Sequence, residues 1–180
     1  MNVARVLHLE CAMHHRSRTP SSIALIVAIA AVCGCSGSSP ISGSPLQGTV
    51  QGAPFRAQSA ALFNEPQGGN VYVVAFDTTL SGCQWPASGG RNVQVHLPAS
   101  DWKTDALYSV DSGGPLTASL DGGGVTSGPN SSVSASATGQ LEVVLATAQS
   151  NDTGVVRLRL NAEVGSDSVE GQVTVTDCRD

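Results

Sequence analysis

Residues 155–176 read VVRLRLNAEVGSDSVEGQVTVT, and this stretch decides the fold class. In its first segment, Val155–Ala162, aliphatic side chains alternate with arginines, and in its second, Val169–Thr176, valines and a glycine alternate with polar side chains. Alternation with a period of two is typical of strands that bury one face. Gly165-Ser-Asp167 lies between the segments and favours a turn. We therefore predict a β-hairpin here and an all-β protein around it.

Similar short segments recur upstream, separated by turns that contain Gly, Pro or Asp. The segments predicted as strands are 46–55 with a turn at Gly52, 70–77, 92–97, 106–110, 116–120 and 139–148. We expect about nine strands in all, and no helix beyond a turn or two near Ser100–Asp105. This organisation predicts one antiparallel β-sandwich or small barrel over residues 46–180.

The pattern of side chains also predicts how three of these strands are buried. Residues 70–77 have no polar face, which indicates burial on both sides. The strand 92–97 is expected to be half-buried, with a polar face made by Asn92, Gln94 and His96. The strand 139–148 places Leu141, Val143 and Leu145 on one apolar face.

The first and last strands share a spacing of glycine and valine. Gly48-Thr-Val50 near the start of the domain is mirrored by Val169-Glu-Gly171 near its end. We interpret the shared spacing as a sign that the two terminal strands lie side by side.

An apolar run of ten residues, 23–32, lies near the N-terminus, and Arg16 and Arg18 precede it. A membrane-spanning helix needs about 20 apolar residues. The apolar region of a signal peptide needs about 7–15. The run therefore predicts export, with translation starting at Met13, which would make a compact signal peptide.

Val32-Cys33-Gly34-Cys35, directly after the run, resembles the bacterial lipobox. The resemblance implies that residues 1–34 are a lipoprotein signal peptide and that Cys35 is lipidated and begins the mature chain. Cys33 departs from the usual Ala or Ser but is also small. An ordinary secretory signal, an uncleaved anchor and a metal or redox pair formed by Cys33 and Cys35 are the alternatives.

A polar segment rich in Gly, Ser and Pro follows, and we predict residues 35–45 to be the lipidated cysteine and a flexible linker. Residues 121–131 have a similar composition and are expected to be a flexible loop. Without residues 1–34 the chain keeps six basic and thirteen acidic residues, a formal net charge of −7. This charge argues against binding to nucleic acid.

Only Cys83 and Cys178 follow Cys35 in the sequence. Two cysteines in an exported chain most simply form one disulfide bond, and two free thiols are the alternative.

A search for catalytic or metal-binding patterns finds one histidine, His96, after the linker. No nucleophile elbow, nucleotide-binding glycine motif or calcium-loop spacing is present. One histidine cannot supply a structural zinc site. We therefore predict no metal and no cofactor, and we interpret His96 as a solvent-facing side chain. A hydrolase with an unrecognised site around His96 is the alternative.

Trp85 and Trp102 are the candidate ligand contacts, because exposed tryptophans stack on sugars and anchor protein partners. The competing interpretation is that they cover the two ends of the core.

The order of these features resembles a group of small uncharacterised envelope lipoproteins of GC-rich Gram-negative bacteria. The features are the lipobox, the Ser/Gly linker, Gly48-Thr-Val-x-Gly52, a mid-chain cysteine and a closing hairpin that ends in a cysteine. The resemblance supports pairing of Cys83 with Cys178. The group has no known activity, so no catalytic residue can be carried over from it. We expect a monomeric, lipid-anchored protein of the bacterial cell envelope, attached to the outer membrane, with an envelope protein or glycan as partner.

Overall fold

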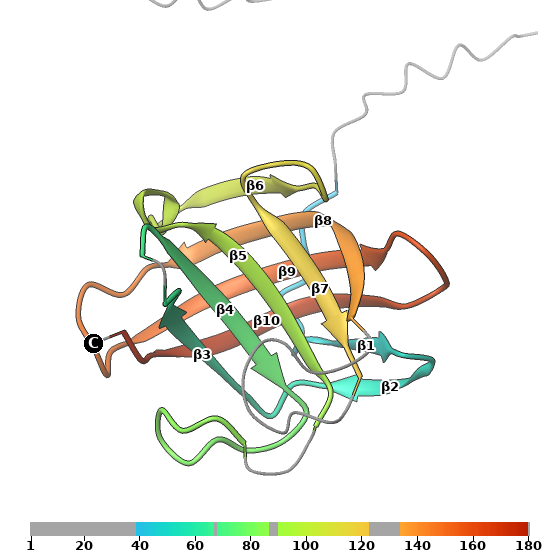
Figure 1. Ribbon diagram of the computed structural model, residues 1–180, viewed down its shortest axis with the longest axis horizontal. Coiled ribbons are helices and arrows are strands. Elements are labelled where there is room, and N and C mark those ends of the chain that lie inside the picture. Colours follow the sequence, from blue (N-terminus) through green and yellow to red (C-terminus); the bar gives the residue numbers. More distant parts are fainter. Residues whose placement is uncertain (1–38, 67, 87–89, 123–133, 180) are drawn as a thin grey trace, which may run out of the picture. The chain divides into compact units, whose positions relative to one another are not determined.

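The computed structural model describes residues 39–66, 68–86, 90–122 and 134–179 (Figure 1). These residues form ten strands and one 3₁₀ turn, η1 (Ala99–Asp101), which lies where a short helical turn was predicted. The strands are β1 (Gln47–Val50), β2 (Ala53–Arg56), β3 (Ser59–Asn64), β4 (Asn70–Phe76), β5 (Asn92–Pro98), β6 (Ala106–Val110), β7 (Thr117–Asp121), β8 (Ser134–Leu145), β9 (Thr153–Ala162) and β10 (Ser168–Asp177). The all-β prediction is confirmed. The predicted loop 121–131 lies mainly outside the described residues.

Seven of the strands close into a barrel, in the order β10, β3, β4, β5, β7, β8, β9 and back to β10. The other three lie outside this ring, with β1 and β2 continuing from β10 and β6 pairing with β8 (Figure 1). Between the two predicted architectures, the structure is therefore a small barrel.

One pair of neighbouring strands is parallel, contrary to the antiparallel prediction. Thr176 and Asp177 of β10 pair in parallel with Ala61 and Leu62 of β3. The reason is geometric, because strand direction cannot alternate all the way around a ring with an odd number of strands. The parallel contact is short, and it is where the barrel closes.

The β9–β10 hairpin that the sequence predicted is continuous over nine paired positions, from Ser168 opposite Asn161 to Thr176 opposite Thr153. Leu158 and Leu160 of β9 are fully buried in the barrel. The terminal strands also lie side by side as predicted, because Gly48 of β1 pairs with Val169 of β10.

The predicted burial of Leu145 is wrong. Leu141 and Val143 are fully buried as expected, but Leu145 is 47 % exposed. The pairing of β8 with β9 shifts between Val143 and Leu145. A bulge of this kind inserts an extra residue and moves the following side chain to the other face of the strand.

The strand β4 is buried on both faces as predicted, and Phe76 on its outward face is fully buried. The predicted half-exposure of β5 is wrong, because Asn92 and Gln94 are 1 % and 5 % exposed. The Gln94 side-chain amide donates to Asn92 Oδ1 and to Asp121 Oδ2, both at 2.8 Å. These hydrogen bonds let a polar face be buried.

Two further details differ from the pattern seen in the sequence. The strand β3 was not anticipated. Residues 106–110 (β6) and 117–121 (β7) lie on either side of a turn as predicted, and in addition both strands pair with β8. β3 pairs along its whole length with the neighbouring β4 and at two positions with the distant β10.

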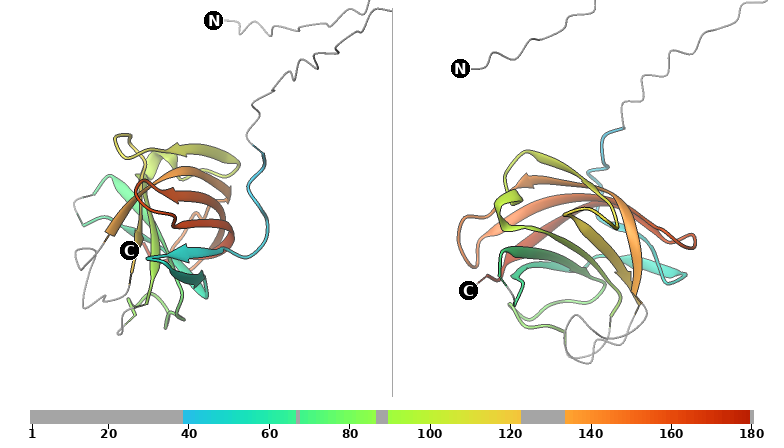
Figure 2. Two further views of the ribbon diagram at one scale, coloured as in Figure 1. Left: turned by 90° about the vertical axis from the view of Figure 1, so that its right-hand side faces the viewer. Right: turned by 45° about the horizontal axis from the view of Figure 1, so that its top comes forward.

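Residues 39–45, hereafter the strap, were predicted to be part of a flexible linker but are bound to the barrel. The strap crosses the outer face of β10 and β9 towards β6 (Figure 2, left). Leu46 and Ser44 exchange backbone hydrogen bonds with Gln172 of β10, at 2.9 and 2.6 Å. Gly171 makes this close approach possible, since a Cβ atom there would lie 2.6 Å from the carbonyl oxygens of Ser44 and Pro45.

Candidate functional site

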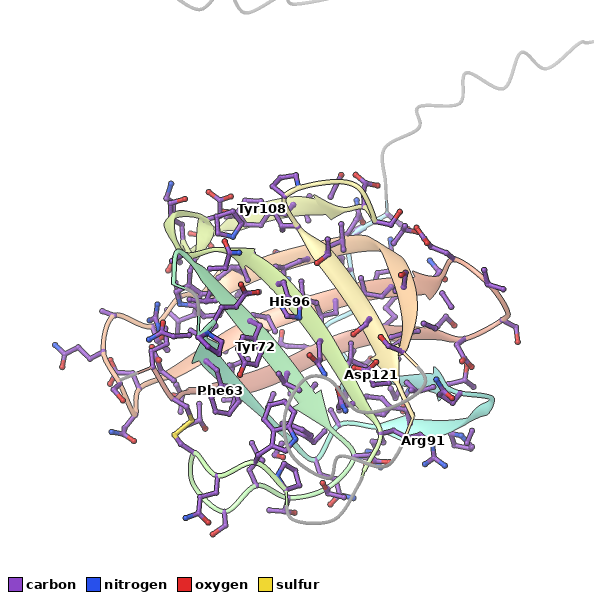
Figure 3. All side chains as sticks on the ribbon, viewed as in Figure 1. Phe63, Tyr72, Arg91, His96, Tyr108 and Asp121 are labelled. Atoms are coloured by element: carbon purple, nitrogen blue, oxygen red, sulfur yellow. A yellow bond between two sulfur atoms is a disulfide. The ribbon has the colours of Figure 1, made fainter. Side chains whose placement is uncertain are left out.

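Three ring side chains form a row on the outer face of the barrel, across β3, β4 and β5 (Figure 3). Phe63 is paired with Tyr72, and Tyr72 with His96, in the registers of these strands. The ring centroids of both pairs are 5.4 Å apart, with interplanar angles of 27° and 18°. We call Phe63, Tyr72 and His96 the aromatic row.

Trp85 packs against one end of the aromatic row from the segment that follows β4. Its ring centroid lies 5.7 Å from that of Phe63 and 5.0 Å from that of Phe76, in an edge-on arrangement with the latter. Its indole Nε1 is buried without a hydrogen-bond partner among the described residues. Two residues earlier, Cys83 is joined to Cys178 by a disulfide bond, as predicted. Trp85 and the disulfide together fasten this segment to the barrel.

His96 was interpreted as solvent-facing, but the structure pairs it with a carboxylate. Its Nδ1 lies 2.6 Å from Oε1 of Glu65, and the two side chains are 30 % and 24 % exposed. The Asn70 side-chain amide donates to the other oxygen of Glu65 at 3.1 Å. Strand β3 ends one residue before Glu65, which places this carboxylate beside the row.

Two groups at the aromatic row, Glu65 and Tyr72, have pKa values shifted from their ordinary ones. The hydrogen bond with His96 lowers the pKa of Glu65, although partial burial acts in the opposite direction. Burial raises the pKa of the Tyr72 phenol, and the nearby charge of Glu65 raises it further. Glu65 is therefore ionised and Tyr72 protonated at neutral pH.

The chemistry that this arrangement offers is limited. A histidine held by a carboxylate resembles the base and orienting acid of hydrolases. Within the described residues, however, the hydrogen-bond partner of His96 is Glu65, and no serine hydroxyl is bonded to it. The described ranges also contain no group of three or more metal-ligating acidic, His or Cys side chains.

The stacking geometry also determines what the aromatic row can bind. The rings lie nearly parallel to one another, so much of each ring face is covered by its neighbour and the edges point outward. Sugar stacking needs an open ring face. The row therefore presents ring edges, a carboxylate and an imidazole to a partner, which suits hydrogen bonding better than stacking.

The two predicted contact tryptophans lie in different environments. Trp102 is 7 % exposed, belongs to the barrel core and donates from Nε1 to Thr147 Oγ1 at 3.2 Å. The structure thus gives Trp102 a role in the core and leaves Trp85, which is half-buried, as the candidate contact. Cys35 lies outside the described residues, and no helix within them is long and apolar enough to cross a membrane.

Glu65, Phe63 and Tyr72 were not recognised as site residues from the sequence. Tyr72 could have been found, because it is an aromatic residue in a strand that was correctly predicted. Phe63 and Glu65 could not, because the strand β3 that positions them was not predicted. Without β3 the row cannot be assembled.

Comparison with protein-family models, with curated proteins and with solved structures gives no match for this chain. Its function must therefore be inferred from its own residues and geometry.

Replacing Trp85 with alanine is expected to lower the free energy of unfolding by about 2 kcal/mol, because the indole covers Phe76 and one end of the aromatic row. Denaturant unfolding of Trp85→Ala measures this, and Trp85→Phe, which keeps an aromatic ring, should retain most of the stability. Unchanged stability of Trp85→Ala would mean that the disulfide alone holds the segment.

Proposed function

We propose that this chain is a lipid-anchored, non-catalytic binding module of the bacterial cell envelope. The observation that carries the proposal is the sequence Val32-Cys33-Gly34-Cys35 directly after an apolar run of ten residues. The disulfide-bonded β-barrel that follows in the sequence supports it, because structural disulfides persist outside the reducing cytoplasm. We assign the protein to the outer membrane and expect it to be a monomer.

The proposed binding surface is the aromatic row with Trp85 and Glu65. These side chains are half-exposed and fixed in place by stacking and by the Glu65–His96 hydrogen bond, so little conformational entropy would be lost on binding. An envelope protein or glycan that donates hydrogen bonds to Glu65 is the partner we propose. The acidic surface argues against nucleic acid.

The alternative, a hydrolase around His96, has one supporting observation, the 2.6 Å contact between His96 and Glu65. The binding role is favoured because Tyr72 stacks on His96 and Phe63 stacks on Tyr72. These contacts pack the row and bring no serine, threonine or cysteine nucleophile to the imidazole.

Mass spectrometry of the N-terminal peptide tests the proposal after expression of the full chain in a Gram-negative host. We expect the mature protein to begin at Cys35 and to carry acyl groups. Cys35→Ser should abolish both cleavage at this site and acylation, whereas Cys33→Ser should retain them because serine is also small. A mature N-terminus elsewhere, or an unmodified Cys35, would contradict the proposal.

A further inference from the structure

The strap is held on the barrel right up to the first described residue. The Arg159 guanidinium donates to the carbonyl oxygens of Ser39 and Pro40 at 2.9 and 2.8 Å. The same guanidinium binds Glu170 Oε1 at 2.7 Å, and that oxygen also accepts from the Ser42 amide at 3.0 Å. Ser39 and Pro40, the first described residues, therefore lie at a defined place beside β6, hereafter the exit point. The strap runs to this place across the outer face of β10 and β9 (Figure 2, left).

A hollow of about 240 Å³ lies at this exit point. Its lining includes Ser39, Pro40 and Ile41 of the strap and Leu107 of β6. β6 is an outer strand that pairs with β8 in the sheet, and its Leu107 is 58 % exposed. The charged side chains that line the hollow are Glu142 and Arg157, which form an ion pair at 3.2 Å, and Asp105. This edge thus presents one exposed leucine, one ion pair and one further carboxylate, Asp105.

The distance from this exit to the lipidated cysteine is short. Cys35 precedes Ser39 by four residues, and four fully extended residues span at most about 14 Å. The headgroup region of one leaflet is about 5–7 Å thick. A lipid on Cys35 therefore keeps Ser39 within about 14 Å of the lipid headgroups, a distance about twice the thickness of the headgroup region.

We propose that the β6 edge, namely Leu107 with the strap exit at Ser39 and Pro40, is a membrane-contact surface whose partner is the lipid bilayer itself. This inference rests on the proposed lipidation of Cys35. It gives the barrel a defined orientation, with the β6 edge against the headgroups. The aromatic row lies on the outer face of β3, β4 and β5 (Figure 3), whereas the strap lies on β9 and β10 on the other side of the ring (Figure 1). The row is then free of the bilayer and accessible to a partner.

Fluorescence quenching in vesicles tests this orientation. Leu107→Cys and Val164→Cys each add one free thiol to a mature chain whose other cysteines are lipidated or in the disulfide, and each is labelled with the same fluorophore. Val164 is the matched control, because it is an aliphatic residue, 86 % exposed, in the β9–β10 turn. The labelled, lipidated proteins are reconstituted into phosphatidylethanolamine–phosphatidylglycerol vesicles that contain a nitroxide-labelled lipid.

We expect quenching at position 107 to be several-fold stronger than at position 164. Arg159→Ala, which releases the strap and lengthens the free tether, should reduce the quenching at position 107 while the protein stays bound. Equal quenching at both positions, or none at position 107 in vesicle-bound protein, would overturn the inference. Absence of acyl groups on Cys35 would instead refute the proposed function.

Discussion

Replacement of both Cys83 and Cys178 by serine is expected to lower the free energy of unfolding by about 4–5 kcal/mol. The two cysteines are 95 residues apart in the sequence, and their link removes much of the conformational freedom of the unfolded chain. The bond also joins the segment that carries Trp85 to the end of β10, next to the parallel contact that closes the barrel. A domain of this size should lose about 15 °C in Tm. Thermal unfolding followed by circular dichroism measures the change.

Reduction provides the control for this prediction. A reducing agent should lower the Tm of the native protein to that of the Cys83→Ser/Cys178→Ser variant and should leave the Tm of the variant unchanged. A native Tm that does not respond to complete reduction would show that the barrel closes without help from the disulfide.

The parts of the fold that could be predicted are those in which one strand carries its own signal. Val155–Ala162 and Val169–Thr176 alternate over their whole length, and Gly165-Ser-Asp167 marks the turn, so neighbouring residues were sufficient to predict this hairpin. The half-buried terminal strand near Gly48 was recognised from its spacing for the same reason.

The parts that could not be predicted depend on segments that are distant in the sequence. Strand β3 contains two adjacent alanines and lacks a polar face, because its outer side is covered as well as its inner side. The polar face of β5 is buried because Gln94 finds a partner in Asp121, a residue of another strand. The candidate site required β3, since Phe63 and the Glu65 carboxylate reach Tyr72 and His96 only by strand pairing.

The second large effect is expected at Asp177, a carboxylate with no exposed surface at the end of β10. Arg179 Nε donates to its Oδ1 at 3.0 Å, and the Thr147 hydroxyl donates to its Oδ2 at 2.6 Å. Thr147 in turn accepts from the indole of Trp102, so the network ties the C-terminal segment to the core. Asp177→Asn removes the charge and replaces one accepting oxygen with an NH₂ group, which faces a donor. We expect the free energy of unfolding, measured with denaturant, to fall by about 3 kcal/mol.

The same substitution should change how stability depends on pH. Burial raises the pKa of Asp177, but the hydrogen bonds from Arg179 and Thr147 outweigh it and hold the pKa below its ordinary value. A lowered pKa in the folded state contributes stability that is fully present above the ordinary Asp pKa and is lost as the pH falls through the lowered value. The stability of the native protein should therefore decline in acid more steeply than that of Asp177→Asn, so the two unfolding curves converge.

Asp152→Asn is the matched control, because Asp152 is an exposed carboxylate in the turn beside the end of β10. Its replacement should change stability by no more than about 0.5 kcal/mol. Thr147→Val keeps the shape of the side chain but removes the hydroxyl that joins Trp102 to Asp177, and it should cost about 1–2 kcal/mol. Equal effects of Asp152→Asn and Asp177→Asn would mean that the buried network adds no more stability than a surface charge. A larger effect confined to Asp177 and Thr147 would instead show that the C-terminal end of the barrel is held by this network as well as by the disulfide.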